Sequence, residues 1–320
     1  MPERALADRE RRLAEALRAL NDAAELGITP EELARAQAYA TGALLSRPFL
    51  YKARVWYLKP TPSVCPGCAR GCTIQIWHRK AEWKLNALDA RRNVSIERIT
   101  PLENPAVNGP WICNKGRDLA QIFERPRAEQ PMQKGKPVDL PAAIAAAGRL
   151  IENAKLPVAL VSSWGSNEEL AAFKQALGGR FAAFVKQDWS PQPGERLDDD
   201  LLIRADKNPN TAAARALFPP LSDPDFTLDA PADLVLIWGE GFDFSRLPAG
   251  TPTIVLDAYT QPEHQHADVF IPVSIQTERR GHYTNFLGVV SAFEPCFPKK
   301  PTVADAETLF AAMVATEVPA

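Results

Sequence analysis

The beginning of the chain has the hydrophobic pattern of helices. Residues 3–24 place leucines on one side and surround them with arginine and glutamate, as in an amphipathic helix. Thr29 can cap a second helix, whose first position is Pro30 and which runs to about residue 40. We therefore expect an N-terminal helical segment over residues 1–45 that docks either on another subunit or on its own chain.

Short strands are predicted in the next part of the chain, residues 46–128. Large apolar and basic residues alternate over residues 51–58, and a second strand-like run follows at residues 74–77. Asn108-Gly109 is a strong turn signal, and residues 116–124 have a helical pattern. We expect a small domain of short strands and turns.

Apolar runs and helical patterns alternate over the last part of the chain, residues 129–320. A polar linker with prolines over about residues 125–139 leads into it. We predict helices at 141–153, 167–177 and 210–217, and strands at 158–161, 181–185, 234–238, 253–256 and 269–271. This order predicts an α/β fold with a parallel sheet, a reduced doubly wound, Rossmann-like domain.

Charge and composition narrow the class of protein. The 320 residues carry 37 basic and 39 acidic side chains and a net charge of −2, which gives no sign of a nucleic-acid partner. No apolar run approaches the ~20 residues of a membrane helix, and the N-terminus lacks the apolar core of a signal peptide. We expect a cytoplasmic protein that inserts no segment into a membrane and reaches it only through partners.

The strongest chemical signal is a group of cysteines. The pattern is Cys65-x2-Cys68-x3-Cys72-x40-Cys113. Three thiolates on one tight loop can hold three corners of a cubane, and a distant fourth closes it, so the spacing favours one [4Fe–4S] cluster. Gly67 and Gly71 let the backbone fold tightly and present N–H groups to sulfur.

A zinc site is the main alternative to a cluster. Structural zinc also takes four thiolates, but usually in two matched C-x2-C pairs, whereas Cys113 has no such neighbour. A disulfide is disfavoured in a cytoplasmic protein, and we expect Cys296 to be an inert thiol. Lys115 follows the fourth cysteine by two residues, where a cation can raise the potential of a cluster.

The cysteine segments resemble a known superfamily. Thr-Pro-Ser-Val-Cys-Pro-Gly-Cys-Ala-Arg-Gly-Cys at residues 61–72 and Val-Asn-Gly-Pro-Trp-Ile-Cys-Asn-Lys-Gly-Arg at residues 107–117 are similar to the 4Fe–4S Mo/W bis-MGD-type domain of molybdopterin oxidoreductases. Within it, the chain most resembles the large iron–sulfur subunit of NADH-quinone oxidoreductase, which is respiratory complex I. Further similar stretches are residues 42–49, 52–57, 267–272, Glu278 and residues 281–285.

The resemblance carries functional expectations. It implies one 4Fe–4S cluster with Lys115 beside it, followed by a degenerate molybdopterin-oxidoreductase-like domain without molybdopterin. It implies a subunit of an NADH dehydrogenase complex in the respiratory chain, with no substrate site of its own and with the other subunits as partners. Such a subunit lies on the cytoplasmic side of the membrane. In the family this cluster lies off the main path of electron transport, so it serves electron transfer or structural support.

The chain also departs from the family pattern. Tyr39 and Ala40 stand where the family has a Cys-Pro that ligates an earlier cluster, and no cysteine precedes Cys65. This implies an N-terminally truncated form without the family's other cluster modules. Two alternatives stay open: a small molybdopterin enzyme of formate-dehydrogenase type, for which no cysteine lies mid-chain as a molybdenum ligand, and a zinc-stabilised, non-redox assembly protein.

The remaining candidates are weaker. Residues 238–242, Trp-Gly-Glu-Gly-Phe, follow a strand and are either a vestigial pterin phosphate site or, as we favour, a plain turn. His264 and His266 form a metal pair or, as we favour, are solvated. His282 is expected to be structural, and residues 198–200 are expected to form a solvated acidic turn. No dinucleotide fingerprint and no catalytic triad are recognisable.

Overall fold

A computed structural model describes residue 29 and residues 53–80, 94–195, 197–199, 201–221 and 232–315. The chain divides into two compact units, Met1–Arg54 and Val55–Ala320. The predicted helical segment over residues 1–45 lies outside the described residues, apart from Thr29. Domain boundaries within the second unit, including the one predicted after residue 128, stay predictions.

The cysteine-rich part is built on a three-stranded antiparallel sheet in the order β1-β2-β3. The strands are β1 (Leu58–Val64), β2 (Thr73–Arg79) and β3 (Ile96–Pro101). Ile74 and Ile76 are fully buried on one face of β2, which confirms the short strand predicted at residues 74–77. Two short helices, α3 (Asn114–Arg117) and α4 (Ala120–Phe123), replace the single helix predicted over residues 116–124.

The strand predicted over residues 51–58 is wrong at residues 55–57, and residues 51 and 52 lie outside the described part of the chain. Val55–Tyr57 forms a 3-10 helix, η1, and the strand begins at Leu58 and continues through Pro60 and Pro62. Because β1 pairs only with β2 within its sheet, prolines without an N–H are tolerated on its outer side. The prolines therefore mark an edge strand here rather than a connector.

The second part of the unit is a seven-stranded sheet in the order β5-β4-β10-β9-β8-β6-β7. Its members are β4 (Met132–Gln133), β5 (Lys136–Pro137), β6 (Pro157–Ser162), β7 (Ala182–Lys186), β8 (Leu234–Trp238), β9 (Thr253–Asp257) and β10 (Val269–Pro272). Strands β6 to β10 run parallel, and β6, β8 and β9 are buried along their whole length. The predicted α/β class is therefore confirmed.

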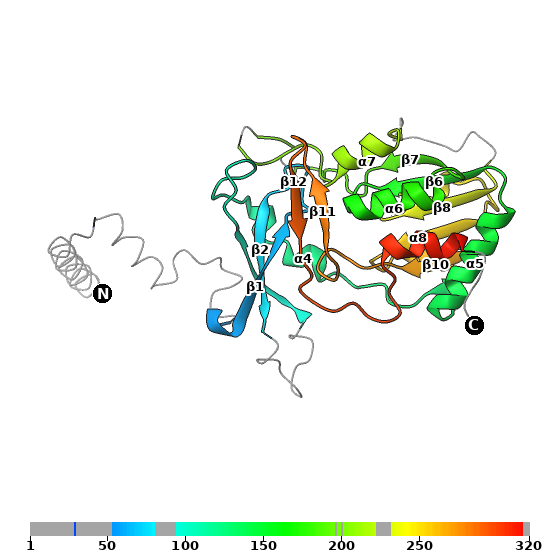
Figure 1. Ribbon diagram of the computed structural model, residues 1–320, viewed down its shortest axis with the longest axis horizontal. Helices are drawn as coiled ribbons and strands as arrows, with labels where there is room; N and C mark the ends of the chain where they lie inside the picture. Colours follow the sequence, from blue (N-terminus) through cyan, green and yellow to red (C-terminus); the bar gives the residue numbers. More distant parts are fainter. Residues whose placement is uncertain are drawn as a thin grey trace, which may run out of the picture. The chain divides into compact units, whose positions relative to one another are not determined.

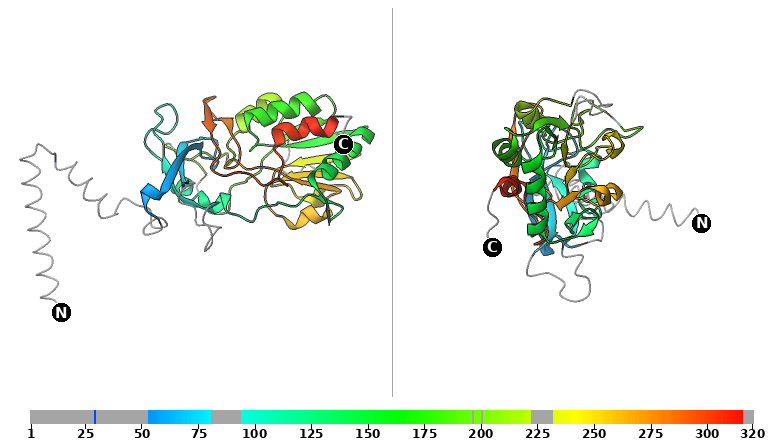
Figure 2. Two further views of the ribbon diagram at one scale, coloured as in Figure 1. Left: turned by 60° about the horizontal axis from the view of Figure 1, so that its bottom comes forward. Right: turned by 90° about the vertical axis from the view of Figure 1, so that its right-hand side faces the viewer.

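The longer helices cover one face of this sheet. They are α5 (Leu140–Asn153), α6 (Asn167–Leu177) and α8 (Ala306–Val314), with the shorter α7 (Thr211–Leu217) beside α6 (Figure 1). Asp139 caps α5, and Ser166 and Glu169 form a capping box at α6. Among the described residues, the other face is covered by loops and by the short 3-10 helices η4 (Phe244–Arg246) and η5 (Pro262–His266), so the longer helices lie on one face and not on both, as a doubly wound fold would have them (Figure 2).

Two hairpins lie where no strand was predicted. The predicted linker over residues 125–139 contains β4 and β5, joined by Lys134 and Gly135, whose φ angles of 49° and 72° suit a tight hairpin turn. Near the C-terminus, β11 (Gly281–Thr284) and β12 (Val290–Phe293) return to the cysteine-rich part and pack Tyr283 and Phe293 against Val64. Strand β1 and the β11–β12 hairpin thus share a core.

Candidate metal centre

Three of the cysteines lie on the loop that joins β1 to β2. The amide of Cys65 donates a hydrogen bond of 2.8 Å to the carbonyl of Cys72, which closes the loop at its base. Within the loop, the amide of Gly71 donates to the carbonyl of Cys68, and Gly71 takes a φ of 60°, a conformation that side chains rarely adopt. All three thiols are buried.

Cys113 reaches this loop because a buried asparagine ties its segment to the start of β2. The Oδ1 atom of Asn108 accepts a hydrogen bond of 2.9 Å from the amide of Thr73, the residue that follows Cys72. Its Nδ2 atom donates to the carbonyl of Trp111 at 3.0 Å. Cys113 then caps α3, where its sulfur accepts a hydrogen bond of 3.4 Å from the amide of Gly116.

The residues predicted as a site line a single cavity of about 260 Å³. A single water needs only roughly 10–15 Å³ on this measure, so there is room for a polyatomic group. The lining contains Cys65, Cys68, Cys72, Cys113 and Lys115. The structure therefore brings together all five residues that the sequence singled out.

The volume of the cavity and the arrangement of the cysteines around it indicate what size of metal group can fit. Within the described ranges, no three His, Cys, Asp or Glu side chains are placed to hold one metal ion. A zinc ion with sulfur at 2.3 Å would need thiolates about 3.8 Å apart. The four cysteines line a cavity of about 260 Å³, which has room for a cluster of several irons.

Backbone amides point to the sulfur atoms. Cys65 accepts from Gly67, Cys68 from Arg70 and Arg204, and Cys113 from Gly116. A Cβ atom at Gly116 would lie 2.5 Å from Cγ1 of Ile112 and 3.6 Å from the sulfur of Cys65, so the helix start can approach only as glycine. N–H donors to sulfur are a known means of stabilising a negatively charged cluster.

Burial sets the protonation of the thiols. It raises the pKa of Cys72 to about 12, and it raises the pKa of Cys68. For Cys65, burial and then the neighbouring thiols Cys72, Cys68 and Cys113 raise the pKa well above its usual value. Metal binding must therefore displace protons from these thiols, which couples assembly of the site to pH.

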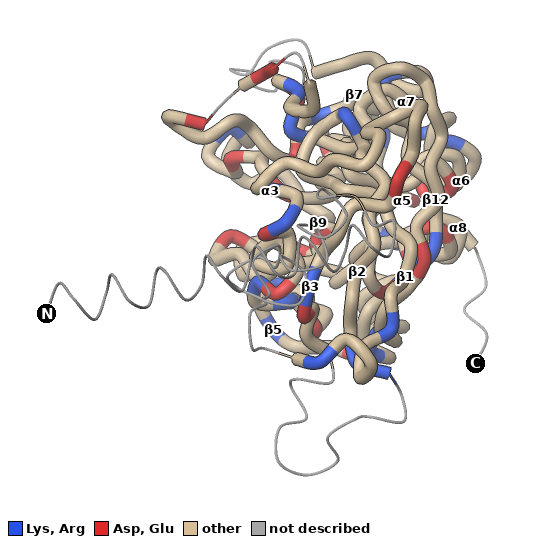
Figure 3. Tube along the Cα trace, turned by 90° about the vertical axis from the view of Figure 1, so that its left-hand side faces the viewer, with Lys and Arg blue, Asp and Glu red and all other residues tan. Residues whose placement is uncertain are grey.

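Lys115 does not face the cavity alone. Its ammonium lies 2.6 Å from Oε1 of Glu195 and 5.0 Å from the centre of the Trp189 ring. Lys207 also lines the cavity, with only 1% of its side chain exposed. Sequence reasoning missed Glu195 and Lys207, because both come from the α/β part of the chain and neither belongs to a motif. Figure 3 shows basic and acidic positions interspersed over the face on which α3 and β3 are labelled.

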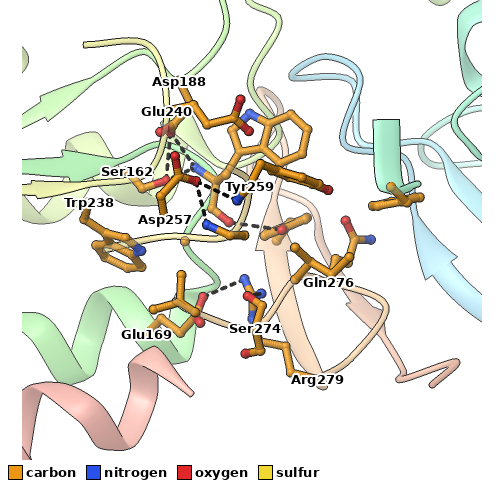
Figure 4. A pocket seen from close by; sticks show the side chains of 18 residues that line it. Ser162, Glu169, Asp188, Trp238, Glu240, Asp257, Tyr259, Ser274, Gln276 and Arg279 are labelled. Carbon is orange, nitrogen blue, oxygen red and sulfur yellow. Dashed lines mark hydrogen bonds and ion pairs between the residues drawn. The ribbon is translucent and has the colours of Figure 1, made fainter. Parts of the chain in front are cut away.

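A second group of polar side chains lies at the carboxyl ends of β6, β8 and β9. In Figure 4, Asp188, Glu240 and Asp257 gather at one end of a small pocket of about 60 Å³. The same three residues also line an adjoining cavity of about 510 Å³. Arg125 binds Glu240 through two hydrogen bonds of 2.7 and 2.8 Å, and Lys186 pairs with Asp188.

The turn at residues 238–242 closes over these acids. Gly239 and Gly241 both have φ angles of 81°, and a side chain at Gly239 would collide with Asp188. Ser162 and Ser163 donate further hydrogen bonds to Asp188. The turn thus packs against a carboxylate that is already satisfied within the protein.

The other sequence candidates have structural surroundings. His264 is buried rather than solvated: its Nε2 lies 3.2 Å from Oδ2 of Asp257 and its ring stacks on Phe270. His266 is exposed, and His282 pairs with Glu168 on the hairpin. Asp199 accepts the amides of residues 201–203, as in a polar turn. Burial raises the pKa of Cys296 to about 12, as expected of an unreactive thiol.

Comparison with known proteins extends this picture. Residues 58–125 match the molybdopterin oxidoreductase Fe4S4 domain. NADPH-Fe(3+) oxidoreductase subunit alpha of Geobacter sulfurreducens is 34% identical over 116 residues, which are 36% of this chain and 12% of that protein. NADH-quinone oxidoreductase subunit 3 of Thermus thermophilus is 28% identical over 209 residues, 62% of this chain and 22% of that protein.

The mitochondrial NADH dehydrogenase (ubiquinone) iron-sulfur protein 1 of Solanum tuberosum is 35% identical over 94 residues, 29% of this chain and 11% of that protein. This chain therefore spans less than a quarter of the length of these three relatives. A solved formyltransferase/hydrolase complex (FhcABCD) from Methylorubrum extorquens aligns with a TM-score of 0.36 at 12% identity, over 57% of this chain and 97% of that chain. The matched domain and the related proteins confirm the resemblance that the cysteine motifs indicated: residues 58–125 match the molybdopterin oxidoreductase Fe4S4 domain, and part of the chain is similar to iron–sulfur subunits of NADH-quinone oxidoreductases.

Proposed function

We propose that this chain is an iron–sulfur subunit of a complex I-like NADH:quinone oxidoreductase and that Cys65, Cys68, Cys72 and Cys113 hold one [4Fe–4S] cluster. The observation that carries the proposal is the shared cavity, into which two segments far apart in sequence bring four cysteines and several N–H donors. When bound, such a cluster accepts and donates single electrons. The protein's part is to bury the thiols, exclude water and hold the donors in place.

The site also links parts of the fold. Its cysteines come from the β1–β2 loop and from the start of α3, and its wall includes residues of the α/β part. A cluster there would act as a covalent crosslink as well as a redox centre. Electron transfer and structural support are thus compatible roles, and a single centre needs partner subunits to carry electrons further.

The pocket at the sheet edge supports this function over that of a molybdopterin enzyme. A pterin dinucleotide brings phosphates, which cations and helix N-termini favour. Here the cations Arg125 and Lys186 are paired with Glu240 and Asp188, and Asp257 adds a further carboxylate. The pocket therefore presents acids where a phosphate ligand would need donors.

We further propose that the chain acts with other NADH dehydrogenase subunits on the cytoplasmic side of the membrane. No described helix has the length and apolar character that a bilayer crossing requires. The relatives from Thermus thermophilus and Solanum tuberosum are named as parts of NADH-quinone oxidoreductase and NADH dehydrogenase. Affinity purification of the tagged chain from its native cell tests this: the other dehydrogenase subunits should be recovered with it.

Metal analysis after anaerobic purification tests the cofactor. We expect about four irons and four sulfides per chain, the content of one cubane, and an EPR signal after reduction. Cys113→Ala should lose the signal and most of the iron, whereas the matched Cys296→Ala should keep both. Stoichiometric molybdenum would favour the pterin enzyme, and one zinc without iron would favour the zinc-stabilised assembly protein.

A further inference from the structure

One wall of the cysteine cavity comes from the α/β part of the chain. Residues 201–208, here the capping segment, contribute Leu202, Ile203 and Lys207 to the lining. The amide of Ala69 donates a hydrogen bond of 2.9 Å to the carbonyl of Asp206, and the guanidinium of Arg70 donates one to the carbonyl of Leu201. The cysteine loop is thus fastened to the capping segment by the two residues that follow Cys68.

The far end of the capping segment is anchored in the sheet region. Asn208 is fully buried, and its Oδ1 atom accepts from the amides of Trp189 and Asp188 at 2.9 and 3.1 Å. Its Nδ2 atom donates to Oδ1 of Asp206 at 3.0 Å. Lys207, which directly precedes Asn208, is therefore held in one position relative to the cavity.

Lys207 is a buried cation. Its ammonium donates to the carbonyls of Leu197 and Arg204 at 3.0 and 2.9 Å and lies 3.8 Å from Oε1 of Glu195. Burying an ammonium is costly unless nearby groups favour its charge. Lys207 and Cys68 line the same cavity, so the buried ammonium shares that cavity with the sulfur atoms.

Lys115, to which the family resemblance points, is placed differently. Its side chain is 35% exposed, against 1% for Lys207, and it forms the shorter of the two contacts to Glu195, 2.6 against 3.8 Å. Solvent and a close carboxylate both weaken the field of a cation at a distance. The field of Lys207 is screened far less.

We propose that Lys207, more than Lys115, is the cation that sets the reduction potential of the cluster, and that Glu195 is the carboxylate that opposes it. The inference rests on the proposed function, because it presupposes a cluster on the four cysteines. Reduction adds one electron from an external one-electron donor to the cluster and breaks no bond. A fixed positive charge beside the cavity favours the more negative, reduced form and so raises the potential. Lys207 is a positioning charge, not a ligand.

An EPR-monitored redox titration of the whole, anaerobically purified chain tests the proposal. In Lys207→Met, the ratio of reduced to oxidised cluster at the wild-type midpoint should fall at least about tenfold, which is 59 mV for one electron. Lys207→Arg should restore most of the shift, since it keeps the charge. Lys115→Met should shift the midpoint less and should lose its shift at high salt, because its charge is exposed.

Glu195→Gln gives a second, independent readout with the opposite sign. Removing this carboxylate should raise the midpoint, and Glu195→Gln keeps a side chain of the same shape that can still accept a hydrogen bond, so it supplies a readout even if Lys207→Met fails to assemble. A Glu195→Gln midpoint at or below the wild-type value would overturn the inference. So would a Lys115→Met shift larger than that of Lys207→Met. If wild-type protein contains no iron, the proposed function fails instead, and metal analysis shows which of the two has failed.

Discussion

Asn108 is the residue whose removal tests how the fourth cysteine is delivered. It is 4% exposed and bridges two segments that are distant in sequence. Asn108→Ala leaves the amide of Thr73 without its acceptor and the carbonyl of Trp111 without this donor, and it removes a third hydrogen bond to the carbonyl of Leu102, which keeps the Thr73 hydroxyl as donor; the three lost hydrogen bonds measure 2.9, 3.0 and 3.3 Å. At about 1 kcal/mol net for each bond, the variant should lose about 3 kcal/mol of unfolding free energy.

Urea unfolding of the metal-free protein measures this loss. With a slope of about 3 kcal/mol per M, the unfolding midpoint should fall by about 1 M. The matched control is Asn153→Ala, which removes an exposed asparagine with one hydrogen bond to the carbonyl of Arg149 and should leave the midpoint nearly unchanged.

The same substitution should loosen the cluster, because Cys113 follows Trp111 closely. If the full 3 kcal/mol is expressed in the bound state, iron release to a chelator should be about 100-fold faster than in the wild type. Two results would refute the reasoning. One is an unfolding midpoint equal to that of Asn153→Ala. The other is a lower midpoint with iron release at the wild-type rate, which would separate Asn108 from the placement of Cys113.

Two further outcomes concern the stability of the α/β part. Phe173 is fully buried among the rings of Trp238 and Phe310, so Phe173→Ala should cost about 3–5 kcal/mol in urea or thermal unfolding, whereas exposed Leu217→Ala should change it by about 0.5 kcal/mol or less. Burial would raise the pKa of Glu168, but hydrogen bonds from His282 outweigh it and hold that pKa below its usual 4.5. A lowered folded-state pKa means stabilisation that is present above pH 4.5 and lost as pH falls through the folded value, so Glu168→Gln should show less acid destabilisation than the wild type below pH 4.5.

The features that sequence predicted are those that local chemistry determines. The parallel strands were recognisable because strands buried on both faces are continuous apolar runs, as at β8 and β9. Helix α5 was recognisable from its alanine-rich run, and α6 from the two glutamates in its first turn. The cysteine set was recognisable because its spacing suits a cluster, although ligation itself stays a prediction.

The features that sequence missed depend on contacts between distant segments. The prolines of β1 suggest a loop until the strand is seen to lie at a sheet edge. The β4–β5 hairpin turns at Lys134-Gly135, which lacks the Asn-Gly or Asp-Gly signal of such turns. Lys207 and Glu195 are recognised as neighbours of the cysteines only once the folded chain places them in the same cavity. No local sequence pattern predicts that contact.

The return of the β11–β12 hairpin to β1 has a consequence for biosynthesis. Gln276 donates to Ser63, 213 residues earlier in the sequence, and the amide of Glu294 donates to the carbonyl of Pro62, so residues made much later complete the surroundings of the cysteine sheet. At about 5–20 residues per second, the ribosome takes roughly 10–40 s to proceed from Cys113 to Glu294. During that interval the nascent thiols lack their final cover, so iron inserted before Glu294 is made must be guarded against oxygen.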